Sequence, residues 1–134
     1  MKTVLKMNQH RKKLAIWAGA GVLPYYAAVN ASKKTEVLII AFKEVADINF
    51  LKKTGCPVVS LSLGEIGKNI RLLKKEKVDH LVMLGKFEKV FLWGKTKFDL
   101  GALSLLFKAG NLRDMSIFQV LADKLTSLSI EVVP

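Results

Sequence analysis

The segment from residue 19 to residue 24 is the part of this sequence best suited to bind a ligand. It reads Gly-Ala-Gly-Val-Leu-Pro, and Pro24 suits the first turn of a helix. Glycines let backbone N–H groups approach an anion closely, and a helix start adds the positive end of a dipole. The candidate binding residues are Gly19, Ala20, Gly21, Val22, Leu23 and Pro24. A tight turn without a ligand is the alternative interpretation.

This segment differs from the known nucleotide-binding fingerprints. Pro24 stands where the dinucleotide pattern has its third glycine. Phe42 and Lys43 stand at the tip of the second expected strand, where that pattern has an acidic residue. The Walker pattern is absent as well. The residues therefore indicate a binding site for an anion, without indicating which anion.

The rest of the sequence offers few groups for catalysis. The two histidines are His10 and His80, and the single cysteine is Cys56, so neither a zinc site nor an internal disulfide is expected. We interpret His80 as a core histidine in an apolar strand, and Cys56 as a structural thiol. Glu44 and Asp47 fit solvated carboxylates at a helix start. We predict no catalytic residue and no metal ligand in this chain.

The charge of the chain favours anionic partners. Lysine and arginine total 22 against 11 acidic residues, which gives a formal net charge of +11. Such a field attracts nucleotides, phospholipid surfaces and nucleic acid, although lysines that only solvate helix faces give the same total. Residues 86–98 interleave lysines with aromatic residues. This pattern suits stacked bases or a membrane interface, and a hairpin that packs on the core is the alternative.

Apolar runs that alternate with helical periodicity predict an α/β fold. We expect a basic lead-in over residues 1–12 and one three-layer, Rossmann-like domain over residues 13–134, with a mainly parallel sheet of about five strands. The expected strands are 13–18, 35–41, 57–61, 80–84 and 129–133; the expected helices are about 23–31, 45–53 and 65–75, with two more that begin near Asp99 and Asn111. Because parallel strands end at one edge, the loops 19–23, 42–44, 62–64 and 85–89 should converge on one crevice.

The uncharged stretch from residue 14 to residue 31 follows a basic run and could be read as a secretory signal. Gly19, Gly21 and Pro24 interrupt it, whereas a signal core is a continuous apolar helix. We therefore favour a strand followed by a helix.

Several segments in order resemble a known family. They are Gly19 to Pro24, Gly85-Lys86, Asp114-Met115-Ser116-Ile117-Phe118, Asp123 and Ile130-Glu131-Val132-Val133. Together they resemble the N-terminal domain of the UDP-2,3-diacylglucosamine pyrophosphatase family of lipid A biosynthesis, the LpxI type, over about residues 13–134. The sequence departs from the family at residues 87–90, where an Arg-Pro is common, and at Met115, where a second aspartate is common.

The resemblance implies a hydrolase that cleaves a UDP-linked diacylated glucosamine into UMP and the lipid sugar 1-phosphate. It implies magnesium as the divalent metal, and a reaction at the cytoplasmic face of the bacterial inner membrane. In the family a second domain follows and carries the acidic residues for catalysis and magnesium. This chain would then be the substrate-binding half, inactive alone, with peripheral membrane contact and a homodimer as further expectations.

The resemblance also implies roles for particular residues. Gly19 and Gly21 would face the ligand through their N–H groups, Lys86 or Lys89 would pair with phosphate, and Gly85 and Asp114 would complete the binding site. Two other hypotheses remain open at this point. One is a basic nucleic-acid- or nucleotide-binding module without catalysis, and the other is a small nucleotide-dependent enzyme that is complete in itself.

Overall fold

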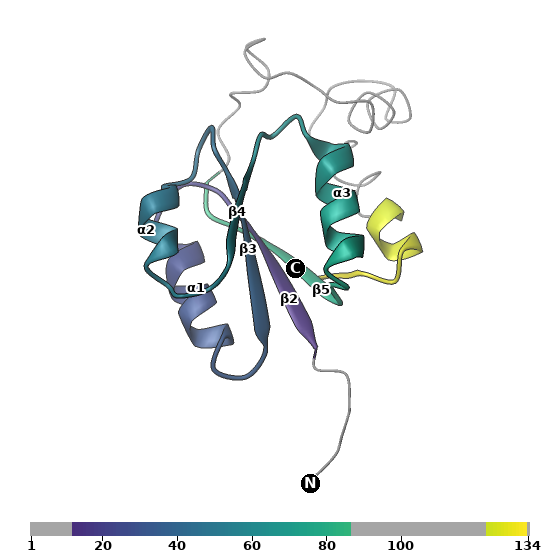
Figure 1. Cartoon of the computed structure of the whole chain (residues 1–134), viewed down its shortest axis with the longest axis horizontal. Coiled ribbons are helices and arrows are strands. Elements are labelled where there is room, and N and C mark those ends of the chain that lie inside the picture. Colours follow the sequence, from purple (N-terminus) through teal and green to yellow (C-terminus); the bar gives the residue numbers. More distant parts are fainter. Residues whose placement is uncertain (1–11, 87–122, 134) are drawn as a thin grey trace, which may run out of the picture.

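The computed structural model describes residues 12–86 and 123–133, which form a five-stranded parallel sheet with helices on both faces (Figure 1). The strands are β2 (Lys13–Ala18), β3 (Glu36–Phe42), β4 (Val58–Leu61), β5 (His80–Leu84) and β6 (Glu131–Val133), in the order β4-β3-β2-β5-β6. The helices are α1 (Leu23–Ala31), α2 (Ile48–Lys52) and α3 (Ile66–Lys75), and residues 123–127 are also helical. The predicted α/β class and parallel sheet are confirmed.

The two central strands are apolar along almost their whole length because both of their faces are covered. In β2 the residues from Ala15 to Ala18 are buried, and in β3 the residues from Val37 to Phe42 are buried. Alternate side chains point to opposite faces of a strand, so each face needs its own layer of helices.

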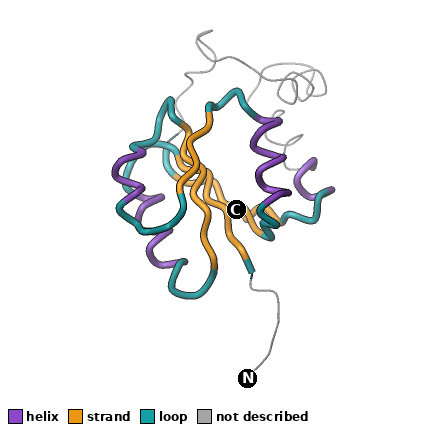
Figure 2. The backbone as a smooth tube through the Cα atoms, in the orientation of Figure 1, coloured by secondary structure: helices purple, strands orange, loops and turns teal. Residues whose placement is uncertain are grey.

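The helices divide into two layers, one on each face of the sheet (Figures 1 and 2). On one face, Ala28 of α1 and Leu51 of α2 belong to a buried cluster with Ile16 and Ile39. On the other face, Leu73 of α3 and Leu125 of the last helix belong to a cluster with Trp17 and Ile40. The uncharged residues 14–31 thus supply a central strand and a covering helix. No helix in the described ranges is long and apolar enough to cross a membrane.

The two helices of the second layer end in the same kind of turn. After α3, Lys77 has φ +55° and the Val78 N–H donates to the Leu73 carbonyl at 3.1 Å. After residues 123–127, Ser129 has φ +64° and the Ile130 N–H donates to the Leu125 carbonyl at 3.0 Å. This is the Schellman arrangement, in which one left-handed residue ends the helix and an apolar pair closes the turn.

Some element boundaries differ from those predicted from the sequence. Helix α2 begins at Ile48 instead of Val45, because the Asp47 carboxylate accepts a hydrogen bond from the Phe50 N–H at 3.1 Å and so caps the helix. The last strand begins at Glu131 instead of Ser129, whose left-handed backbone cannot continue a strand.

The interpretation of His80 as a core residue is wrong. Its side chain is 29% exposed, and Nε2 lies 3.3 Å from Oε1 of Glu131 on the neighbouring strand. Four expected features lie wholly or partly outside the described residues: the basic lead-in before residue 12, the lysine- and aromatic-rich segment beyond Lys86, the helix expected after Asp99 and the start of the helix expected near Asn111.

The left-handed residue after α3 allows a test of the turn. We expect Lys77→Gly to stabilise the protein by about 0.5–1 kcal/mol, because relief of left-handed strain outweighs the added freedom of the unfolded chain. Lys74→Gly is the matched control within the helix and should destabilise by about 1 kcal/mol. Urea unfolding midpoints measure both effects. If the two glycines change the midpoint in the same direction, this account of the turn is wrong.

Candidate functional site

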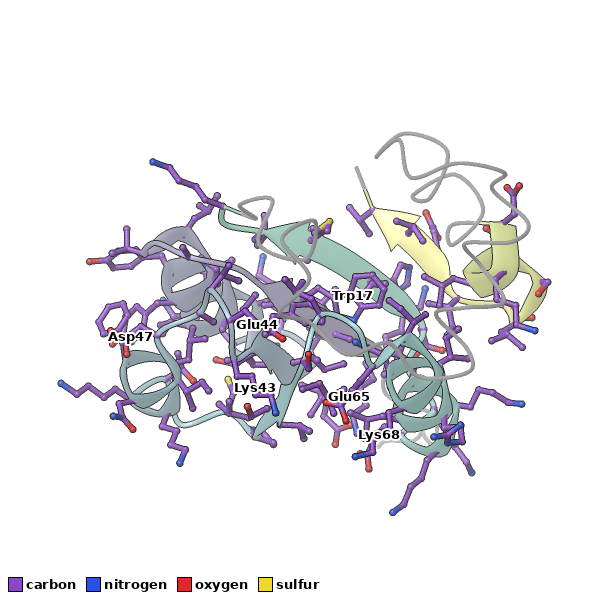
Figure 3. The ribbon with its side chains drawn as sticks, turned by 90° about the horizontal axis from the view of Figure 1, so that it is seen from above. Trp17, Lys43, Glu44, Asp47, Glu65 and Lys68 are labelled. Atoms are coloured by element: carbon purple, nitrogen blue, oxygen red, sulfur yellow. The ribbon has the colours of Figure 1, made fainter. Side chains whose placement is uncertain are left out.

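The carboxyl ends of the strands meet at one edge of the sheet, and Figure 3 looks down on this edge. The loops that leave it are residues 19–22 after β2, 43–47 after β3, 62–65 after β4, and Gly85 and Lys86 after β5. The predicted convergence is confirmed for these residues. The chain leaves β2 toward β3 on one side and later returns to β5 on the other side, which makes β2–β5 the switch point where such sheets bind ligands.

The backbones after β2 and β5 are joined at this switch point. The Gly19 N–H donates to the Leu84 carbonyl at 2.8 Å, and Ala20 exchanges hydrogen bonds with Lys86 at 2.8 and 2.9 Å. Gly85 has φ +96°, and a Cβ placed there would lie 2.7 Å from the Ala20 carbonyl oxygen. Only glycine fits this contact, because any side chain would push the two backbones apart.

The next residues of the same loop carry free donors. Gly21 is exposed with φ +98°, and a Cβ placed there would meet no atom within 4 Å. The N–H groups of Gly21, Val22 and Leu23 have no hydrogen-bond partner within the described ranges. No side chain caps α1, and its first turn holds no acidic residue. The positive end of the helix is therefore left open to an anion.

The expectation for Gly19 needs correction. Its N–H is directed to the Leu84 carbonyl, so it does not face a ligand, and the Ala20 N–H is likewise occupied by the Lys86 carbonyl. Gly21 keeps the predicted role of exposed donor, and Pro24, which is buried, begins the helix without needing a partner for an N–H.

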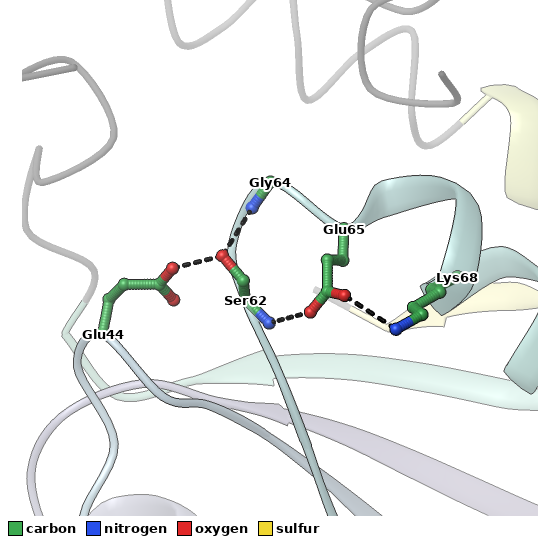
Figure 4. Close-up of polar contacts among 5 residues, drawn as sticks. All are labelled: Glu44, Ser62, Gly64, Glu65 and Lys68. Atoms are coloured by element: carbon green, nitrogen blue, oxygen red, sulfur yellow. Dashed lines mark hydrogen bonds and ion pairs between the residues drawn. The ribbon is translucent and has the colours of Figure 1, made fainter. Parts of the chain in front are cut away.

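Two carboxylates tie the loops after β3 and β4 around Ser62 (Figure 4). Glu44 accepts hydrogen bonds from the Ser62 hydroxyl and, at 2.9 Å, from the Leu63 N–H. Glu65 accepts one from the Ser62 N–H at 2.7 Å and forms an ion pair with Lys68 at 3.0 Å. Glu44 is thus a link between loops, and its interpretation as a solvated carboxylate is wrong. That interpretation holds for Asp47, which is exposed and caps α2.

The hydrogen bonds at Glu65 alter its acidity. The Ser62 N–H, followed by Lys68, holds the pKa of the Glu65 carboxyl below its ordinary value of 4.5. The carboxylate is therefore charged at neutral pH and keeps both contacts. Glu44, Asp47 and Glu65 each accept a hydrogen bond from a backbone N–H group of the protein itself.

The donor set at this edge does not fit a magnesium site. In residues 12–86 and 123–133, no three His, Cys, Asp or Glu side chains come together to hold a metal ion. The described edge presents unpaired N–H groups and exposed lysines instead. We assign none of its residues a part in bond cleavage.

A buried polar pair lies behind these loops. Trp17 Nε1 donates to Asn69 Oδ1 at 2.8 Å, and the Trp17 ring meets Phe42 edge to face with 5.8 Å between centroids. Asn69 is 0% exposed, and its Nδ2 has no partner in the described part of the chain. This bond joins the first turn of α3 to β2 close to its last residue.

The structure therefore brings together Gly21 to Pro24, Gly85 and Lys86, whereas Lys89 and Asp114 lie outside the described residues. Sequence reasoning missed the roles of Glu44, Ser62 and Glu65. Their signal was available, since each polar residue follows a buried strand by one to four positions. Their pairing across 18 residues, from Glu44 to Ser62, is not visible in the order of residues.

Comparison with models of protein families gives a match to the LpxI N-terminal domain over residues 13–134. A search of the curated proteins gives no match.

The junction between β2 and β5 predicts unequal effects of two alanines. Gly85→Ala should destabilise the protein by about 3 kcal/mol or more, since it adds a backbone clash to left-handed strain. Gly21→Ala has strain without a clash and should cost about 1 kcal/mol. Urea unfolding measures both. Similar losses for the two variants would contradict the close approach at Gly85.

The lowered pKa of Glu65 predicts a pH-dependent stability. A carboxyl with a depressed folded pKa contributes stability above its unfolded value of 4.5, and the contribution disappears as pH falls through the folded pKa. We expect Glu65→Gln to cost about 1 kcal/mol at neutral pH and much less in acid.

Unfolding by urea at pH 7 and at the lowest pH where the protein stays folded measures this difference. Glu36→Gln is the control, because the Glu36 side chain is exposed and forms no ion pair with the described residues. A cost for Glu65→Gln that is the same at both pH values would refute the role of the charge.

Proposed function

The chain belongs to the LpxI N-terminal domain family, and we propose that it forms the substrate-binding half of a hydrolase in lipid A biosynthesis. In the proposed reaction, water cleaves the pyrophosphate bond of UDP-2,3-diacylglucosamine. The products are UMP and 2,3-diacylglucosamine 1-phosphate. We propose that this takes place at the cytoplasmic face of the bacterial inner membrane, where a lipid-linked substrate is accessible.

One observation carries the binding role. Three successive N–H groups, from Gly21 to Leu23, are unpaired at the start of α1, beside the switch point of a parallel sheet. A pyrophosphate is rich in acceptor oxygens and negative charge, which is what a helix start with free donors binds. Lys86 is exposed and held next to this loop by its backbone hydrogen bonds to Ala20, so its ammonium group adds positive charge nearby.

The cleavage step itself needs groups from elsewhere. Glu44 and Glu65 at this edge are engaged in internal hydrogen bonds, and no three His, Cys, Asp or Glu side chains of the described residues come together to hold a metal ion. In the proposed enzyme, a second domain supplies the acidic residues and the divalent metal, which acts as a Lewis acid on the pyrophosphate. The role of this chain is to hold and orient the substrate, and the 134-residue chain alone is expected to be inactive.

Binding of soluble nucleotides tests the proposed role. Calorimetric titration of the 134-residue chain should show that UDP binds at least about tenfold more tightly than uridine, because only UDP presents phosphates to the loop. Lys86→Gln should weaken UDP binding by about three- to tenfold. Lys33→Gln is the matched control, because Lys33 is exposed just after the far end of α1, and it should leave UDP affinity unchanged.

Three results would count against this proposal. Equal affinity for UDP and uridine would show that the loop does not bind phosphate. Turnover of the UDP-lipid by this chain with magnesium would show that the catalytic groups are in this half. Tight binding of short RNA with a steep salt dependence, without any response to UDP, would instead favour the nucleic-acid-binding hypothesis.

A further inference from the structure

The start of α1 presents an exposed apolar surface. Val22 is 57% exposed, and Leu23 and Tyr26 are each 56% exposed. Residues 22, 23 and 26 lie on adjacent positions of one helical turn, so their side chains form a continuous surface. Burying three large apolar side chains in a nonpolar medium is favourable, and leaving them in water as a group is uncommon on a surface without a partner.

Aromatic contacts connect this surface to α2. The Tyr26 ring meets the Tyr25 ring edge to face, with 5.2 Å between centroids. Tyr25 in turn stacks on Phe50 of α2 at 4.4 Å. These ring contacts pack Tyr25 and Tyr26 of α1 against the neighbouring helix.

Unpaired positive charge lies at the same edge of the sheet. Lys86 is brought beside the loop by its hydrogen bonds to Ala20, and the exposed Lys43 follows β3 (Figure 3). In the described part of the chain neither lysine forms an ion pair. Among the nearby carboxylates, Glu44 bonds to Ser62 and Leu63. Glu65 bonds to Ser62 and Lys68, and the charge of Lys43 acts on it at longer range.

We propose that Val22, Leu23, Tyr26, Lys43 and Lys86 form a docking rim for an anionic phospholipid bilayer. The apolar side chains enter the boundary between headgroups and acyl chains, where the amphipathic ring of tyrosine is favoured. The two lysines contact lipid phosphates, because the negative potential of an anionic membrane surface attracts basic side chains. A bilayer fits both halves of the rim, since it offers an apolar layer directly beneath a plane of negative charge.

This proposal shares Lys86 with the proposed UDP site, whereas Val22, Tyr26 and Lys43 have no part in the proposed nucleotide contacts through their side chains. It needs no nucleotide, and it concerns side chains on the outer surface of α1 and at the strand ends, whereas the proposed substrate contacts are chiefly backbone N–H groups. The membrane orientation that it implies turns the free N–H groups of Gly21 to Leu23 toward the bilayer surface. A substrate anchored by acyl chains would reach them from that side.

Vesicle sedimentation with the 134-residue chain tests the rim. We expect binding to vesicles of phosphatidylcholine with phosphatidylglycerol, and weak or no binding to phosphatidylcholine alone. Lys43→Gln with Lys86→Gln should lower the partition coefficient about 10- to 30-fold. The matched control is Lys33→Gln with Lys34→Gln, which removes the same charge beyond the other end of α1 and should change binding less than about twofold.

The apolar half has its own variants. Leu23→Ser with Tyr26→Ser should lower binding about tenfold or more, and should abolish the fraction that resists high salt. Val132→Ser, at an exposed apolar position on β6, is the control and should bind as the unmodified protein does. Thermal unfolding of each variant shows whether it is folded.

Any one of three results with vesicles overturns the proposal, and a fourth comes from the oligomeric state. The unmodified protein fails to bind anionic vesicles; or the Lys33 and Lys34 control loses as much binding as the Lys43 and Lys86 pair; or the Leu23 and Tyr26 pair binds normally. Analytical ultracentrifugation addresses a competing occupant. If the protein is a dimer that the Leu23 and Tyr26 substitutions dissociate, the rim is an interface between copies, and membrane docking is wrong.

Discussion

The approach of two backbones between β2 and β5 is the contact on which the edge of this molecule depends. Gly85 lies so close to the Ala20 carbonyl that no Cβ fits between them, and paired hydrogen bonds from Gly19, Ala20 and Lys86 hold the contact. This junction joins the two loops that leave the sheet at its switch point. It uses the N–H groups of Gly19 and Ala20, whereas the next three, from Gly21 to Leu23, have no partner among the described residues. Free donors arise here because the first N–H groups of a helix have no partner within the helix.

The charge of the edge follows from how its carboxylates are used. Glu44 and Glu65 both accept hydrogen bonds from Ser62, and Asp47 accepts one from the Phe50 N–H in the first turn of α2. Each satisfies backbone donors that a loop would otherwise leave unpaired. Since the acidic groups are engaged in building the loops, the lysines at the same edge determine its field. The same bonds that order the loops therefore leave the lysines as the exposed charges that we propose attract negative partners.

The sequence predicted elements well and contacts poorly, for a physical reason. Continuous apolar runs such as residues 36–42 and the helical period of residues 66–75 are local signals, and both elements are found close to where they were predicted. The family match over residues 13–134 agrees with the ordered segments that resembled it. The link from Glu44 to Ser62, and the loss of the Gly19 N–H to Leu84, depend on where distant segments meet in space. Local pattern carries no information about them, and His80 was misplaced because an apolar strand end was mistaken for the core.

The hydrogen bond from Trp17 to Asn69 restricts the orientation of α3 on the sheet. Apolar side chains such as Leu73 would tolerate small rotations of this helix about its axis, since hydrophobic contacts are not directional. The indole N–H can donate to the Asn69 amide oxygen in only one orientation of α3. If the helix were shifted or rotated, this N–H would become a second buried donor without an acceptor. One polar pair inside an apolar layer thus favours a single orientation of the helix over others that would bury a similar apolar area.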